Sequence, residues 1–114
     1  MKLLTTIAAA GLLGLLFAHP LQASGSVEHQ TLKAMFPGTF QAVVQGYQMS
    51  FVARRDGSLV GQYQSQTDTG RWSIQSGQLC IMLSSWLSGR TSCARVVPHG
   101  EDWYRADQVL FRKL

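Results

Sequence analysis

The side chains able to do acid–base or metal chemistry are few and scattered. His99 lies beside Glu101 and Asp102, a grouping that would suit a small metal or acid–base cluster. The same segment begins Pro-His-Gly, and such residues are typical of a solvated turn, which is the simpler interpretation. Outside the first 23 residues the other histidine is His29, and it belongs to no recognisable motif. Two isolated histidines do not make a typical zinc site, so we expect no metal and no cofactor.

No nucleophile has the surroundings that catalysis requires. The chain contains no Gly-x-Ser-x-Gly sequence, which places the serine of many hydrolases on a sharp turn. Glu101 and Asp102 are adjacent, and adjacent side chains on an extended chain point to opposite faces. No glycine-rich phosphate loop precedes a helix. A small hydrolase is therefore the last of three functional hypotheses, and we expect a protein that is not an enzyme.

Aromatic and arginine side chains are the stronger functional candidates. Trp86 and Leu87 lie in a serine-rich loop, where a large apolar pair either contacts a partner or folds over the end of the sheet. Together with Arg90 and Arg95 they form our candidate binding site for a protein or an envelope component. A second aromatic set falls on predicted strands and would line a cavity in an open barrel: Tyr47, Phe51, Tyr63 and Trp72.

The two cysteines, Cys80 and Cys93, are predicted to form one structural disulfide. Strands are expected around each cysteine, and folding them into a hairpin places the two residues opposite each other. A redox pair or a metal site is the alternative, but the spacing is not Cys-x-x-Cys and further ligands are few. The register of this hairpin predicts two core-facing pairs and two outward pairs: Leu79 with Ala94, Ile81 with Ser92, Met82 with Thr91, and Gln78 with Arg95.

The first 23 residues have the pattern of a secretory leader. A positive start at Lys2, an apolar run that ends before Pro20 and small residues up to Ala23 predict cleavage after Ala23. An uncleaved anchor is the alternative, but it needs about 20 apolar residues and this run is shorter. Removing residues 1–23 from the 114-residue chain takes one lysine, so the net charge falls from +4 to +3. We expect a bacterial periplasmic or secreted protein that neither spans a membrane nor binds nucleic acid.

Residues 38–114 predict an all-β domain. Charged residues make up 14% of the chain, against about 25% in typical soluble proteins. Alternating apolar residues and turn signals such as Asp56-Gly57 indicate seven or eight short antiparallel strands, with another turn at Thr67–Gly70. A small barrel is the first choice and a two-sheet sandwich the second. In residues 24–37, apolar positions at helical spacing from Val27 to Phe36 predict a short helix.

Several short motifs give the chain a family resemblance. They are Gly38-Thr39-Phe40, Asp56-Gly57, Gly70-Arg71-Trp72, Gly77-Gln78-Leu79-Cys80, Cys93, Gly100 and Tyr104. In this the chain resembles small secreted bacterial proteins of unknown function that share a Gly-x-Trp…Gly-x-Leu-Cys…Cys…Gly…Tyr pattern. The resemblance implies a periplasmic β-domain and carries over no catalytic residue.

Two binding hypotheses are left open by these observations. The preferred one is a non-enzymatic interaction module, inhibitor-like, immunity-like or envelope-associated, which presents the Trp86 loop to an unknown partner. The alternative is a small-ligand carrier, because an eight-stranded barrel either fills its interior with side chains or holds one small ligand. An open apolar cavity would favour the carrier, and a packed interior would exclude it.

Overall fold

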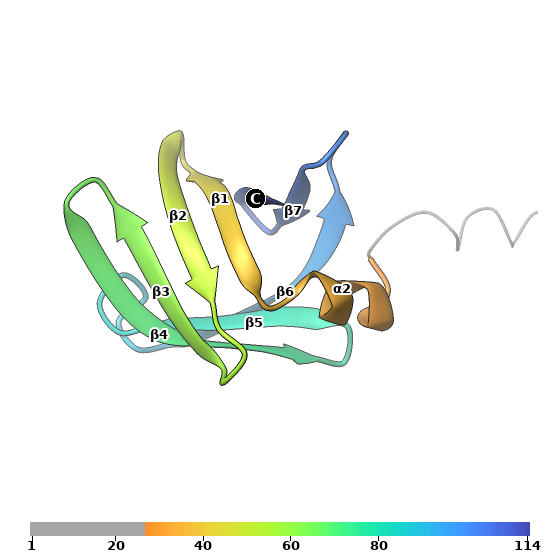
Figure 1. The fold of residues 1–114 in the computed structure, drawn as a ribbon, viewed down its shortest axis with the longest axis horizontal. Coiled ribbons are helices and arrows are strands. Elements are labelled where there is room, and N and C mark those ends of the chain that lie inside the picture. Colours follow the sequence, from red (N-terminus) through yellow and green to blue (C-terminus); the bar gives the residue numbers. More distant parts are fainter. Residues whose placement is uncertain (1–26) are drawn as a thin grey trace, which may run out of the picture.

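A computed structural model describes residues 27–114, and the predicted leader lies outside this range (Figure 1). Eight antiparallel strands follow one another around a closed barrel, and the last pairs with the first. The predicted barrel is thereby confirmed in place of the sandwich. The strands are β1 (Gly38–Val44), β2 (Tyr47–Ala53), β3 (Ser58–Tyr63), β4 (Gln66–Gln75), β5 (Gln78–Leu83), β6 (Thr91–Pro98), β7 (Tyr104–Ala106) and β8 (Val109–Lys113).

The alternation and turn chemistry of the sequence explain the first strands. In β1, Phe40 and Ala42 are buried, while the positions between and before them are more exposed. The β2–β3 turn has the expected Asp-Gly pair. Asp56 accepts hydrogen bonds from the backbone N–H of Ser58 at 2.9 Å and from its hydroxyl at 2.7 Å. Gly57 has a φ of +93°, which a residue without Cβ adopts with little strain.

The turn expected at Thr67–Gly70 is wrong, because this segment belongs to β4. The chain reverses earlier, at Gln64 and Ser65, and Gln64 takes a φ of +54°. Asp68 is buried, and its carboxylate accepts hydrogen bonds from backbone N–H groups of the β5–β6 loop. Aspartate is typical of turns, but Asp68 lies within a strand and binds the loop between two other strands. The local sequence does not reveal this contact.

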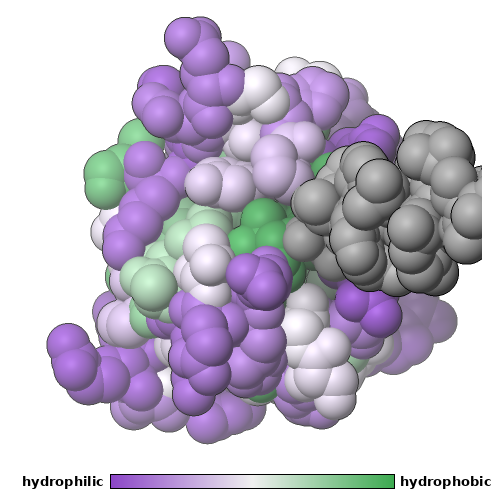
Figure 2. All heavy atoms as spheres, turned by 90° about the vertical axis from the view of Figure 1, so that its right-hand side faces the viewer, coloured by the Kyte–Doolittle hydropathy of each residue, from purple (hydrophilic) through white to green (hydrophobic). Residues whose placement is uncertain are grey.

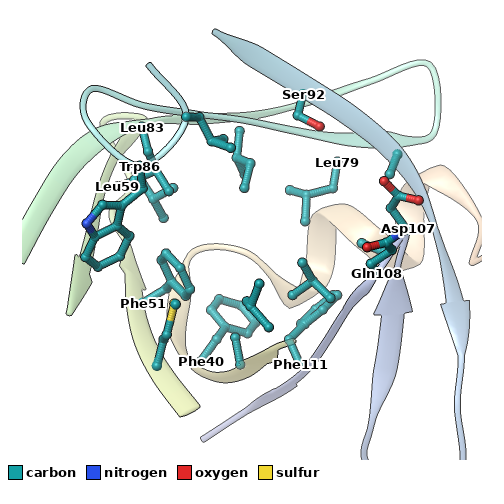
Figure 3. A pocket seen from close by; sticks show the side chains of 18 of the residues that line it. Phe40, Phe51, Leu59, Leu79, Leu83, Trp86, Ser92, Asp107, Gln108 and Phe111 are labelled. Atoms are coloured by element: carbon teal, nitrogen blue, oxygen red, sulfur yellow. The ribbon is translucent and has the colours of Figure 1, made fainter. Parts of the chain in front are cut away.

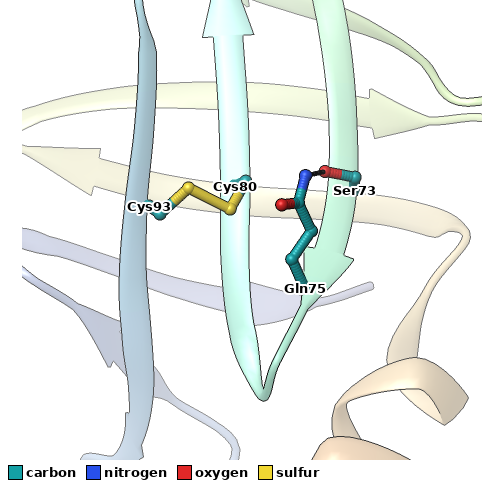
Figure 4. Close-up of a disulfide and its surroundings, with 4 residues drawn as sticks. All are labelled: Ser73, Gln75, Cys80 and Cys93. Atoms are coloured by element: carbon teal, nitrogen blue, oxygen red, sulfur yellow. Dashed lines mark hydrogen bonds between the residues drawn. A yellow bond between two sulfur atoms is a disulfide. The ribbon is translucent and has the colours of Figure 1, made fainter.

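The disulfide and its register are confirmed. Cys80 of β5 is bonded to Cys93 of β6 and is 1% exposed. Figure 4 shows the bond between these neighbouring strands, with Ser73 and Gln75 of β4 on the far side of β5. The Gln75 amide donates a hydrogen bond to the Ser73 hydroxyl at 2.9 Å. The other pairs are those predicted: Leu79 with Ala94, Ile81 with Ser92, Met82 with Thr91, and Gln78 with Arg95.

The short helix predicted in the N-terminal segment is α2 (His29–Met35), which lies against one end of the barrel (Figure 1). Leu32 is its fully buried residue. Phe36 follows the helix and stacks on Phe40, with 4.6 Å between ring centroids, and lies 5.2 Å from the ring of Trp72. This end of the barrel is therefore closed by aromatic rings. In residues 27–114, no helix is long and apolar enough to cross a membrane.

The barrel has one weak seam, between β6 and β7. β7 is only three residues long and pairs with Val96, Val97 and Pro98 at the end of β6. Within residues 27–114, no strand pairs with Thr91–Arg95 on that side, although this half of β6 is fully paired with β5 on the other. The seam places a short unpaired strand edge in the wall of the barrel.

Loss of the disulfide should lower the stability of the barrel. The two cysteines are 13 residues apart, and closing a loop of this length stabilises a domain by about 3 kcal/mol in the chain-entropy description. We expect urea unfolding of a Cys80→Ala/Cys93→Ala variant at pH 7 to give a free energy of unfolding lower by about 3 kcal/mol. The reduced wild-type protein is the control and should lose the same amount. A double variant as stable as the oxidised protein would contradict this expectation.

Candidate functional site

A cavity of about 400 Å³ lies inside the barrel. Its wall is built by β1, β2 and β3, by β5 to β8, by the residue that follows α2 and by the β5–β6 loop (Figure 3). Ligand cavities in proteins have volumes of about 300–1,000 Å³, so this one has room for a small organic molecule. The interior is therefore partly open, although a chain this short could have filled it with side chains.

One side of the cavity is aromatic. Phe40 of β1 meets Phe111 of β8 edge to face, with 5.9 Å between ring centroids. Phe51 of β2 meets Trp86 of the β5–β6 loop with 6.3 Å between centroids and an interplanar angle of 86°. This perpendicular arrangement is favoured because the positive edge of one ring faces the negative face of the other. The rings therefore hold one another in place around the cavity (Figure 3).

The opposite side is aliphatic, and several of its side chains are small. Leu79 and Ile81 of β5 project inward. Their partners across the ladder are Ala94 and Ser92 of β6, and Ala106 of β7 continues the same wall. Small side chains at neighbouring inward positions do not reach the aromatic residues across the barrel. Their small size accounts for the open space.

A buried carboxylate holds the β5–β6 loop over the barrel. Asp68 is 6% exposed. It accepts hydrogen bonds from the backbone N–H of Trp86 at 2.7 Å, of Ser85 at 3.0 Å and of Thr69 at 3.0 Å. The hydrogen bond from Trp86 is the main cause that lowers the pKa of Asp68 below its usual 3.8, while burial opposes it. The carboxylate thus fixes the backbone that carries the Trp86 ring.

Gly61 of β3 makes room for that ring. A Cβ atom at Gly61 would lie 2.7 Å from Cε1 of Phe51 and 2.7 Å from Cζ3 of Trp86. Both distances are well below the roughly 3.5–4.0 Å at which carbon atoms attract. The absence of a side chain at this inward position lets the two aromatic rings meet across the strand. Two features therefore position Trp86. Its backbone N–H is bonded to the carboxylate of Asp68, and its ring occupies the space that a side chain at Gly61 would fill.

The candidate binding site around Trp86 needs correction. Trp86 and Leu87 line the cavity instead of forming an exposed apolar pair, because Asp68 holds the loop inward. Arg90 and Arg95 are exposed, and neither belongs to the cavity wall. The four residues thus separate into an interior pair and an exterior pair.

The expected cavity lining is also corrected, at three of its four positions. Phe51 lies in the wall. Tyr47 is 55% exposed and packs edge to face on Tyr63 near the end of the barrel where the β1–β2 and β3–β4 turns lie. Trp72 belongs to the opposite end, where its Nε1 donates a hydrogen bond of 2.7 Å to the backbone oxygen of Arg54. Tyr47 begins β2 and Tyr63 ends β3, whereas Trp72 lies within β4. Alternation alone does not show where a cavity stops.

Three polar side chains complete the wall: Ser92 of β6, and Asp107 and Gln108 of the β7–β8 turn. All three are exposed, so they mark the side of the cavity that is open to solvent. Figure 2 shows apolar atoms between polar side chains on the face that carries α2, β6 and β7. The predicted hairpin register already placed Ser92 on the inward face. No sequence signal identifies Asp107 or Gln108, because a two-residue turn does not reveal whether its side chains face a cavity.

His29 and His99 lie outside this site. Nδ1 of His29 accepts a hydrogen bond from the backbone N–H of Gly77 at 3.1 Å, which ties α2 to the β4–β5 turn. His99 is exposed after β6. In the part of the chain that the structure describes, no three His, Cys, Asp or Glu side chains are grouped as metal ligands.

Replacing Asp68 should release the loop. Asp68→Asn keeps the shape of the side chain but removes its charge and leaves one acceptor oxygen. With the amide nitrogen in the place of Oδ1, the N–H of Thr69 loses its acceptor. The hydrogen bonds that Ser85 and Trp86 donate to Oδ2 lose their charge assistance. We expect amide hydrogen exchange at these two residues to become about tenfold faster at pH 7. Because the folded state lowers the pKa of Asp68, its stabilising contribution is complete above the usual 3.8 and is lost as the pH falls through the lower folded value. The free energy of unfolding of Asp68→Asn should therefore fall less at acid pH than that of the wild type.

Asp56→Asn is the matched control. The pKa of Asp56 is also lowered, mainly by the hydrogen bond from the backbone of Ser58, but Asp56 lies in the β2–β3 turn at the opposite end of the barrel. This variant should also lose part of the acid sensitivity, yet it should leave exchange at Ser85 and Trp86 unchanged. Unchanged exchange at Trp86 in Asp68→Asn would show that the carboxylate does not hold the loop.

Comparison of the chain with protein-family models, with curated proteins and with solved structures found no match. The resemblance to small secreted bacterial β-domains therefore stays a prediction.

Proposed function

We propose that this protein binds one small apolar molecule inside its barrel and acts as a carrier or a receptor for it, without catalysis. The observation that carries the proposal is the apolar cavity of about 400 Å³. Unfilled space in a small domain is destabilising, because the residues around it lose packing contacts. A bound apolar molecule would restore those contacts.

The affinity for an apolar ligand can be estimated from the number of carbon atoms that the cavity would bury. Transfer of one methylene group from water to an apolar site contributes about 0.8 kcal/mol, so an eight-carbon chain contributes about 6 kcal/mol. This free energy lies between those of about 4 kcal/mol for millimolar and about 8 kcal/mol for micromolar binding. A preformed aromatic side limits the cost of ordering the site on binding.

The interaction-module hypothesis has less support. It needs Trp86 to be free to contact a partner, and here Asp68 and Phe51 hold Trp86 against the interior. An inhibitor-like, immunity-like or envelope-associated role stays a prediction for the exposed arginines. We place the carrier function in the bacterial periplasm or outside the cell, because the first 23 residues have the pattern of a secretory leader.

Filling the cavity should weaken binding. N-phenyl-1-naphthylamine is a neutral apolar dye whose fluorescence rises in apolar surroundings, and we expect it to bind the wild-type protein in a saturable titration. Ala94→Leu adds three carbon atoms at an inward position of β6, so it should weaken dye binding about tenfold.

Thr91→Leu is the matched control, because it adds a leucine to the same strand at an exposed position outside the cavity wall. It should bind the dye as the wild type does. No saturable dye binding by wild type, or equal weakening in both variants, would overturn the proposed function.

A further inference from the structure

The polar groups of the cavity wall are gathered on one side. Ser92 comes from β6, and Asp107 and Gln108 come from the β7–β8 turn. Figure 3 shows these three side chains on one side of the cavity, with Phe51, Leu59 and Trp86 on the other. A ligand in this cavity would therefore meet an apolar interior and one polar, solvent-exposed side.

The backbone of β6 adds hydrogen-bonding groups on the same side. The Cα atoms of Cys80 and Cys93 are 4.0 Å apart, which is typical of an antiparallel pair that does not exchange hydrogen bonds. The N–H and C=O groups of Cys93 therefore point away from β5, toward the seam. Within residues 27–114, no strand pairs with β6 there until Val96. These groups lie in the strand segment between Ser92 and Ala94, which both line the cavity.

The charge at this side is negative. Among residues 27–114, Asp107 is the charged residue of the cavity wall, and neither lysine nor arginine lines it. A carboxylate has only hydrogen-bond acceptors, so it favours a ligand group that donates and disfavours another carboxylate. The whole chain carries +4, which would favour an anion at long range. At physiological salt, charges farther than about 8 Å are largely screened. The nearby carboxylate of Asp107 should therefore determine which head-group charge the cavity prefers.

We propose that the ligand of this cavity is a small amphiphile with a hydrogen-bond-donating head group, an amine in preference to an alcohol, held at the β6–β7 seam beside Asp107. This inference rests on the proposed function and specifies its ligand class. The tail occupies the apolar interior toward α2, and the head group faces the seam. The cavity volume corresponds to about a dozen groups of the size of water or methylene, at roughly 30 Å³ each.

Three ligands with the same tail separate the head-group preferences. Octylamine, octan-1-ol and nonanoate share an octyl tail and differ at pH 7 in a cationic, a neutral or an anionic head. Each is titrated against the protein loaded with N-phenyl-1-naphthylamine, and dye displacement gives its affinity. We expect octylamine to bind most tightly, octanol next and nonanoate about tenfold or more weaker than octylamine.

Asp107→Asn tests whether this residue sets the order. The variant keeps a polar side chain but removes the charge, so octylamine affinity should fall to about that of octanol while octanol affinity stays unchanged. Asp102→Asn is the matched control, because it makes the same change in net charge in the exposed turn at the other end of β7. It should retain the order of the wild type.

The possible results are distinguishable. Equal affinity of the three ligands, or tightest binding of nonanoate, would overturn the amine preference while the dye result keeps the proposed function. An identical loss of octylamine affinity in both variants would assign the effect to overall charge and overturn the role of Asp107. Failure of the dye and of all three ligands to bind would overturn the proposed function itself.

Discussion

The interior of a closed eight-stranded barrel has a size that is set mainly by the number of strands and their stagger. The sequence decides only how much of that interior its inward side chains fill. In this chain, large aromatic residues of β1, β2 and β8 face small residues of β6 and β7, such as Ala94 and Ala106. The two sides do not meet, and the space between them is the cavity. Because the interior is unfilled, the hydrogen bonds of Asp68 to the β5–β6 loop and the seam between β6 and β7 affect how a ligand could reach and occupy it.

The two ends of the barrel are closed by different physical means. At one end, α2 buries Leu32 and brings Phe36 onto Phe40, so apolar packing excludes water. At the other, the carboxylate of Asp68 holds the backbone of the β5–β6 loop, so charge-assisted hydrogen bonds keep Trp86 over the interior. The polar residues near the short β7 strand mark the side by which a ligand would enter.

The hairpin around the cysteines could be predicted because its constraints are local. Two cysteines allow one pairing, and alternation then determines which residues face inward, including Leu79 and Ser92. The helix before β1 was also evident from its apolar spacing and the Pro-Gly pair after it. Short strands joined by tight turns predicted seven or eight strands and favoured a barrel over a sandwich, and the structure has eight strands in a closed barrel.

The candidate site was less predictable, because its decisive contacts join residues far apart in the chain. Asp68 reads locally as a turn residue, and its true partners are the N–H groups of Ser85 and Trp86. Alternation gives the inward face of a strand but not the depth at which a side chain sits, so Tyr47 was expected inside and lies exposed. The shortness of β7, which creates the seam, depends on pairing partners rather than on local sequence.

The most direct test of an open, ligand-accepting interior is to locate a bound molecule by NMR. With methyl-labelled protein saturated by octan-1-ol, we expect nuclear Overhauser effects from the octyl chain to the methyl groups of Leu79, Leu83 and Val109, which line the cavity. Val52 and Val60 form an outward-facing pair on β2 and β3 and should show none. Effects confined to the outward valines, or none at all at saturation, would contradict the account.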